Sequence, residues 1–168
     1  LGQYLKNKKA QFKIQSKFIV ESPEFSFEKS FSRTLENLGA DAIEGVYFHK
    51  YNDFKNYTRF DEIEKYKAKG LFKKLGVSIY SNEELDNLAS NSAVDMIQIP
   101  FNIFDRDEKK ISLLKLAKKN GKQIYCRSVF LQCLYLMDPH SLPQKLNSFF
   151  RPIFDSQQFA KNLKSSLS

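Results

Sequence analysis

The feature of this sequence that most constrains its fold is a regular alternation of short apolar segments with amphipathic ones. Five segments have the composition of strands, namely residues 12–20, 42–49, 72–78, 94–99 and 122–129. The segments between them carry apolar side chains at helical spacing, as Phe27, Phe31 and Leu35 do. Strands that recur about every 20–30 residues with helices between them are typical of βα units joined by right-handed crossovers. The pattern therefore predicts an α/β fold with a parallel sheet.

Signals for the ends of helices support this interpretation. Ser26 is suited to cap the helix that begins at Phe27, and Gly39 is suited to end it. The sequence Ser-Asn-Glu-Glu at 81–84 has the form of a capping box. The polar, aromatic-rich segment 50–59 is predicted to be a loop, and Pro152 is predicted to interrupt a helical tail.

The composition excludes several classes of protein. No apolar run approaches the ~20 residues that cross a bilayer, so we expect no membrane partner. The start of the chain does not have the pattern of a secretory leader. The two cysteines, Cys126 and Cys133, are too few for a disulfide framework, and two histidines give no zinc spacing. We therefore expect a cytoplasmic protein without a metal site.

The net charge of +8 permits a nucleic-acid partner, but the distribution of the lysines argues against one. They fall in small groups, namely Lys6, Lys8 and Lys9; Lys65, Lys67 and Lys69; Lys73 and Lys74; Lys109 and Lys110; and Lys118, Lys119 and Lys122. Most lie near the ends of predicted helices, where cations suit the helix dipole. We interpret them as solvated surface, and a basic nucleic-acid-binding module stays the weakest alternative for the function.

Polar residues close each predicted strand. They are Lys17, His49, Ser78, Gln98 and the pair Arg127–Ser128. In a barrel of parallel strands, catalytic groups come from this rim, because the strand ends converge there. The sequence contains neither G-x-G-x-x-G nor G-x-x-x-x-G-K-[ST], so no fingerprint supports a doubly wound nucleotide domain instead.

These residues resemble the aldo-keto reductase family, and the resemblance covers nearly the whole chain. The ordered segments that carry it are Gln15-Ser16-Lys17, Asp41 to His49, Lys74 to Ser81 with Gly-Val-Ser, Val94 to Asn102, and Cys126 to Gln132. They are similar to the third to seventh strands of the family's barrel. The resemblance implies a partial (β/α)8 TIM barrel that lacks the first two strands and the last strand. The resemblance also implies that residues 1–168 form a single incomplete domain. The length of 168 residues agrees with a partial barrel, because a complete barrel takes roughly 250 residues.

The function that the resemblance implies is NADPH-dependent reduction of an aldehyde or ketone to an alcohol. Lys17 and His49 would be catalytic: the lysine lowers the pKa of a tyrosine that protonates the alkoxide, and the histidine orients the carbonyl. The implied cofactor-binding residues are Ser78 and Gln98 for the carboxamide, and Arg127, Ser128 and Phe130 for the ring or pyrophosphate. Many members of the family carry an aromatic residue in place of Arg127.

The family's catalytic aspartate and tyrosine would precede Leu1, so we expect little or no activity from this chain alone. Tyr47 lies about 6–7 Å deeper along its strand than His49 and is not expected to replace the missing acid, nor is Tyr4. The alternative is a non-catalytic interaction or regulatory protein derived from a decayed reductase. An open five-stranded piece of a barrel leaves two unpaired edges, through which copies of the chain could form a homo-oligomer.

Overall fold

The computed structural model describes residues 12–22 and 24–166, and Tyr4 lies outside them. The chain divides into two compact units. One comprises Leu1–Pro100 and Asp105–Arg127, and the other comprises Phe101–Phe104 and Ser128–Ser168. We describe each unit separately, and the single domain over residues 1–168 stays a prediction.

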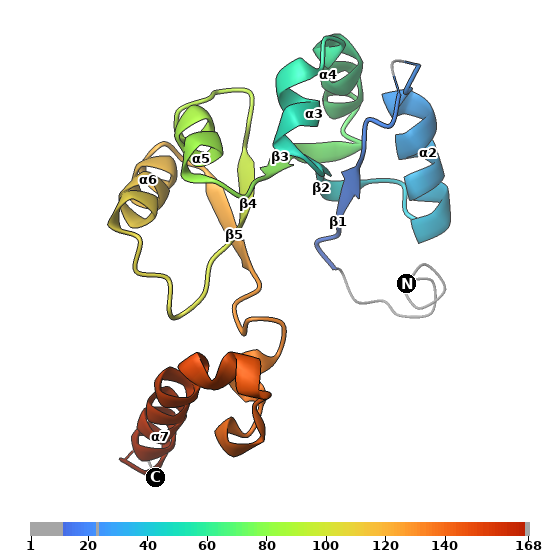
Figure 1. The fold of residues 1–168 in the computed structure, drawn as a ribbon. Helices are drawn as coiled ribbons and strands as arrows, with labels where there is room; N and C mark the ends of the chain where they lie inside the picture. The colour runs from blue at the N-terminus through green and yellow to red at the C-terminus, as the bar shows by residue number, and fades with distance from the viewer. Residues whose placement is uncertain (1–11, 23, 167–168) are drawn as a thin grey trace. The chain divides into compact units, whose positions relative to one another are not determined.

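The first unit holds a five-stranded parallel sheet whose strands follow one another in chain order. The strands are β1 (Gln15–Phe18), β2 (Ile43–Phe48), β3 (Phe72–Ser78), β4 (Met96–Pro100) and β5 (Gln123–Arg127). Between them lie α2 (Phe27–Leu38), α3 (Tyr51–Asn56), α4 (Phe60–Ala68), α5 (Asn82–Ala89) and α6 (Glu108–Lys119). Figure 1 shows this alternation of strand and helix. The predicted α/β fold with a parallel sheet is confirmed.

The helix ends form as their residues indicate. The Ser26 hydroxyl accepts a hydrogen bond from the backbone N–H of Lys29, and Gly39 ends α2 with a φ of 60°. In the capping box of α5, the Ser81 hydroxyl accepts from the Glu84 N–H at 3.2 Å, and the Glu84 carboxylate accepts from the Ser81 N–H at 3.1 Å. Local side-chain chemistry therefore sets these boundaries.

Two of the sequence-based expectations for local structure are wrong. Part of the segment expected to be a loop forms the short helix α3, because Phe54 becomes buried with its ring 5.5 Å from that of Phe48. Pro152 does not interrupt the C-terminal helix α7 (Phe150–Ser166). It lies in the first turn of that helix, where a backbone N–H has no partner within the helix in any case.

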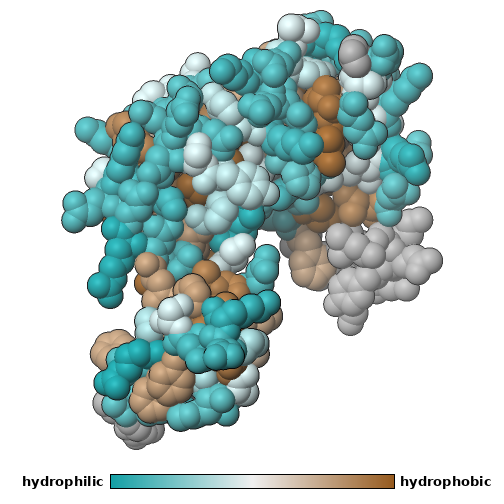
Figure 2. Space-filling model, in the orientation of Figure 1, coloured by the Kyte–Doolittle hydropathy of each residue, from teal (hydrophilic) through white to brown (hydrophobic). Residues whose placement is uncertain are grey.

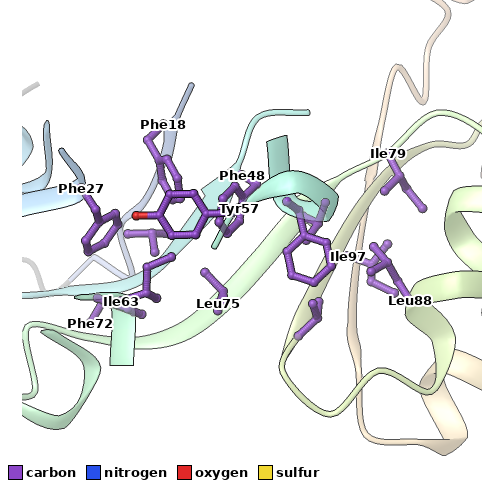
Figure 3. Close-up of a cluster of buried hydrophobic side chains, with 14 of the residues drawn as sticks. Phe18, Phe27, Phe48, Tyr57, Ile63, Phe72, Leu75, Ile79, Leu88 and Ile97 are labelled. Atoms are coloured by element: carbon purple, nitrogen blue, oxygen red, sulfur yellow. The ribbon is translucent and has the colours of Figure 1, made fainter. Parts of the chain in front are cut away.

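The core of the first unit lies between the sheet and its helices. Phe18, Phe48, Phe72 and Leu75 point from the strands toward this layer, and Phe27 meets them from α2 (Figure 3). The rings of Phe18 and Phe48 lie 4.4 Å apart, and the Phe27 ring lies 5.2 Å from Phe18. Because successive side chains of a strand alternate between faces, the burial of Phe18 and Phe48 directs Lys17 and Tyr47 to the other face of the sheet.

That other face is concave, as contacts between non-adjacent strands show. Lys17 of β1 donates a hydrogen bond to Gln98 of β4, although β2 and β3 lie between these strands. The Tyr47 ring of β2 meets the Tyr125 ring of β5 edge-on at 6.3 Å. A flat sheet could not bring these side chains together, because neighbouring strands are about 4.8 Å apart. The sheet is therefore an arc of a barrel.

The surface of the first unit is largely polar. Figure 2 shows mainly hydrophilic residues on the visible side of this unit. Lys122 departs from the surface interpretation of the lysines: it is 9% exposed. Its ammonium donates to the carbonyl oxygens of Asn91 and Val94, the latter at 2.6 Å. This lysine therefore fixes the loop before β4 rather than contributing to a basic surface.

The second unit is built from short 3-10 turns, η1 (Leu134–Leu136), η2 (Pro139–Ser141) and η3 (Gln144–Phe149), followed by α7. The rings of Phe150 and Phe154 stack at 5.7 Å, and His140 packs edge-on against Phe150 at 5.2 Å. The Gln157 amide donates to the carbonyls of Tyr135 and Met137 at 2.7 and 3.0 Å. Within the described part of both units, no helix is long and apolar enough to span a membrane.

Candidate active site

Three of the predicted site residues converge at the carboxyl ends of the strands. The Gln98 side-chain oxygen accepts hydrogen bonds from the Lys17 ammonium and, at 3.5 Å, from the Ser78 hydroxyl. Ser78 and Gln98 are register partners on β3 and β4, and Ser78 is 1% exposed. The structure therefore brings together one residue from each of three strands, around a single amide.

Lys17 is exposed, although part of its side chain lies against the sheet. Partial burial and then the positive charge of Arg127 hold the pKa of Lys17 below its ordinary value, because both disfavour the ammonium form. Arg127 ends β5, and Lys17 lies on β1. The curvature of the sheet therefore brings two cations from its two edge strands toward the carboxyl-terminal rim of the concave face, which we call the mouth of the sheet.

The Arg127 guanidinium lies over the ring of Tyr80, with its central carbon 4.1 Å from the ring centre. Its Nε and Nη2 atoms are buried and have no hydrogen-bond partner among the described residues. Tyr80 was not among the predicted site residues. Tyr80 lies two residues after Ser78, the last residue of β3, and residues just beyond a strand end often belong to the site of a barrel. This position is the sequence signal that could have identified Tyr80.

His49 follows β2 directly, and its backbone N–H donates to the Phe18 carbonyl at 2.9 Å, which continues the pairing of β1 and β2. Its side chain is half-buried. The structure gives the imidazole no hydrogen bond within the described ranges. His49 therefore lies at the predicted rim without being joined to the Lys17–Gln98–Ser78 cluster.

Tyr47 forms the floor of the concave face. It is 1% exposed, and its hydroxyl contacts the Gln15 side-chain oxygen at 3.3 Å and the Met96 sulfur at 3.6 Å. Burial, followed by the effect of Tyr125, raises the pKa of Tyr47. A tyrosine with a raised pKa whose hydroxyl points to Gln15 is not the acid that Lys17 would serve. Sequence reasoning did not single out Gln15 or Met96, although Gln15 is two residues before Lys17 and so shares its face.

Ser128 and Phe130 belong to the second unit. Ser128 has a φ of 57°, and its carbonyl accepts from the Leu131 N–H at 2.9 Å. Phe130 is 50% exposed, and its ring stacks on Tyr135 at 6.1 Å. Their contacts with a cofactor stay a prediction.

No group of metal-ligating side chains is found within residues 12–22 and 24–166. Cys126 and Cys133 are free thiols and both are exposed. The side chains at the carboxyl ends of the strands offer an amine (Lys17), an amide (Gln98), a hydroxyl (Ser78) and a guanidinium (Arg127).

An arc of parallel strands, with its core against the helices and its polar side chains at the carboxyl ends, defines the class of (β/α)8-barrel proteins. The sequence identifies the family within this class of barrel proteins. The model of the aldo/keto reductase family matches residues 1–149, so the chain belongs to this family. The resemblance inferred from the sequence is confirmed.

Solved structures agree with this fold. A Klebsiella pneumoniae aldo/keto reductase in complex with NADP and acetate is 17% identical with a TM-score of 0.67, over 88% of this chain and 54% of that one. An aldo-keto reductase from Bacillus halodurans, in its holo form, is also 17% identical with a TM-score of 0.66, over 85% and 51%. A Pseudomonas aeruginosa protein assigned to the aldo-keto reductases is 24% identical with a TM-score of 0.58, over 74% and 53%.

The chain thus spans about half the length of these structures. The predicted partial barrel is confirmed as the fold. No curated protein matches the sequence.

Proposed function

We propose that the chain forms the core of an NADPH-dependent aldo-keto reductase, which acts in the cytoplasm on a small-molecule aldehyde or ketone. The observation that carries this proposal is the convergence of Lys17, Ser78 and Gln98 at the strand ends of a chain that belongs to the family. When bound at these residues, the cofactor would provide hydride-transfer chemistry toward the carbonyl carbon. The open edge strands β1 and β5 are proposed to let copies of the chain pair.

The residues at the mouth of the sheet fit a nicotinamide cofactor. The Gln98 oxygen is occupied by Lys17 and Ser78, which fixes the amide and leaves its N–H groups to donate to a carboxamide oxygen. The unpartnered Nε and Nη2 atoms of Arg127 fit an anionic pyrophosphate, and its planar group also fits a flat ring. Contacts from Ser128 and Phe130 rest on the family resemblance alone.

Lys17 is proposed to favour the phenolate of a catalytic tyrosine, because a nearby ammonium lowers a phenol pKa that is ordinarily near 10. His49 is proposed to orient the substrate carbonyl. In the part of the chain that the structure describes, Lys17 binds an amide and no tyrosine hydroxyl. Cofactor binding is therefore a more direct test of the proposal than turnover.

The test is a titration of NADPH fluorescence with the full chain. Loss of a hydrogen bond to the carboxamide is worth about 0.5–1.5 kcal/mol, so Gln98→Leu should weaken binding roughly 3- to 10-fold. Gln123→Leu is the matched control. Gln123 is an exposed amide at the opposite end of the neighbouring strand, 3.2 Å from the Tyr125 hydroxyl, so its loss should leave NADPH affinity unchanged.

Failure of the wild-type chain to bind NADPH would contradict the proposal and favour the non-catalytic alternative. Equal weakening by both substitutions would contradict the assignment of Gln98. NADPH oxidation with a panel of nitrobenzaldehydes supplies a second readout, in which Lys17→Met should abolish whatever turnover the chain supports.

A further inference from the structure

Lys17 has an unusual set of partners for a lysine at a strand end. Its ammonium donates to the neutral amide of Gln98, and none of the ion pairs among the described residues includes it. Residues 1–11, 23 and 167–168 contain no Asp or Glu, so every acidic side chain lies in the described part. Lys17 is therefore held in place by a neutral acceptor and not by a carboxylate.

The surroundings of Lys17 on the concave face disfavour the ammonium form. Partial burial and the positive charge of Arg127 both lower the pKa of Lys17, and its register partner on β2 is Tyr47, whose pKa is raised by burial. Lys17 also borders a groove of about 520 Å³ along α2. The charged residues that line this groove are Glu21, Glu24, Lys29 and Arg33, two of each sign. A lysine beside a cation and without an ion-paired carboxylate is the arrangement that activates an amine as a nucleophile.

We infer that Lys17 captures aldehydes covalently, as an imine formed at the mouth of the sheet. The neutral Nζ attacks the carbonyl carbon, and one proton passes from the nitrogen to the oxygen to give a carbinolamine. The nitrogen lone pair then expels the hydroxyl, which leaves as water with the second proton of the nitrogen, and a carbon–nitrogen double bond replaces the carbon–oxygen one. Water reverses both steps. No oxidant, reductant or cofactor takes part, so this activity lies beyond the proposed reduction and does not rest on it.

The surroundings of Lys17 support each step. Lys17 is exposed, so an aldehyde reaches its amine from solvent. The hydrogen bond to Gln98 fixes one N–H and so orients the nitrogen. The Ser78 hydroxyl donates to the same amide oxygen and so helps to hold the side chain that orients Lys17.

The experiment traps the imine. The full chain is incubated at pH 7 with 4-nitrobenzaldehyde and sodium cyanoborohydride, without NADPH, and is then digested with chymotrypsin for mass spectrometry. Cyanoborohydride reduces the imine to a stable secondary amine, which adds a defined mass to the modified lysine. Because a fall in the pKa of a lysine raises its neutral fraction at pH 7, we expect the Lys17 peptide to be labelled several-fold faster than the other lysine peptides.

Two variants make the result specific. Lys17→Arg should remove the fast phase of labelling. Lys13→Arg is the matched control: Lys13 is exposed and lies four residues before Lys17, ahead of β1, so the fast phase should remain. Circular dichroism of each variant checks that the fold is retained. Uniform labelling of the exposed lysines, or a fast phase that survives Lys17→Arg, would overturn the inference.

Discussion

The packing of the concave face predicts that a side chain at Gly76 destabilises the fold. Gly76 is the residue of β3 that lies opposite Tyr47. A Cβ atom at Gly76 would lie 2.4 Å from two ring carbons of Tyr47 and 3.1 Å from the Met96 Cβ. Carbon atoms in contact are normally about 3.5–4.0 Å apart, so the ring would have to move by about 1 Å. Tyr47 is 1% exposed and its ring abuts Tyr125, so the ring has little room to move.

The magnitude follows from two opposing effects of Gly76→Ala. Overpacking of a core costs about 1–3 kcal/mol, and the loss of glycine's freedom in the unfolded chain returns about 0.4–1 kcal/mol. The net expectation is a loss of about 0–2.6 kcal/mol in the free energy of unfolding. For a chain of this size, each kcal/mol lowers the melting temperature by roughly 2–4 °C.

The assay is urea unfolding followed by circular dichroism, for the wild type, Gly76→Ala, Tyr47→Leu and the double variant. If the clash with the Tyr47 ring causes the loss, Gly76→Ala should cost less than about 0.5 kcal/mol once that ring is gone. An equal cost in both backgrounds, or a gain in stability for Gly76→Ala alone, would refute the packing of Tyr47 against β3.

Three further predictions concern charges and polar groups. Arg127→Met removes a cation that lowers the pKa of Lys17, so the pH dependence of aldehyde trapping should move to higher pH. Arg127→Lys keeps the positive charge and should shift the profile less. An unchanged profile in Arg127→Met would argue against the electrostatic coupling of Arg127 to Lys17. Burial raises the pKa of Tyr57 to about 12, above its unfolded value of about 10. The free energy of unfolding should therefore fall as the pH rises from about 10 to about 12. Urea titrations at alkaline pH should lack this part of the decline in Tyr57→Phe. Lys122→Met leaves the Val94 carbonyl without its donor, and the Asn91 carbonyl keeps only the N–H of Val94, which should lower the free energy of unfolding by about 1–3 kcal/mol.

Local structure in this chain was predictable where neighbouring residues determine it. The Ser81–Glu84 capping box and the Ser26 cap work through atoms within three residues, so their sequence pattern suffices. Helix α3 could not be predicted in this way, since what stabilises it is the packing of Phe54 against Phe48 and Phe60. Such contacts depend on the fold as a whole rather than on propensity.

The candidate site was predictable to the same limited extent. Strand alternation and the resemblance to the family predict that Lys17, Ser78 and Gln98 lie at one end of the sheet. The hydrogen bond from Lys17 across two strands to Gln98 requires the curvature of the sheet, which no single segment encodes. The contact of Arg127 with Tyr80 is likewise a consequence of how separate strand ends come together.

The partner of Lys17 determines which of its two proposed chemistries is possible. A carboxylate beside the amine would raise its pKa and keep it an ammonium ion, the form that favours a neighbouring phenolate. Partial burial and the charge of Arg127 do the opposite, and so they favour the neutral amine that attacks a carbonyl. Substituting Gln98 by Glu should therefore suppress imine trapping at pH 7 while leaving Lys17 in place. The same lysine thus supports proton chemistry or covalent capture according to the charge of one neighbouring side chain.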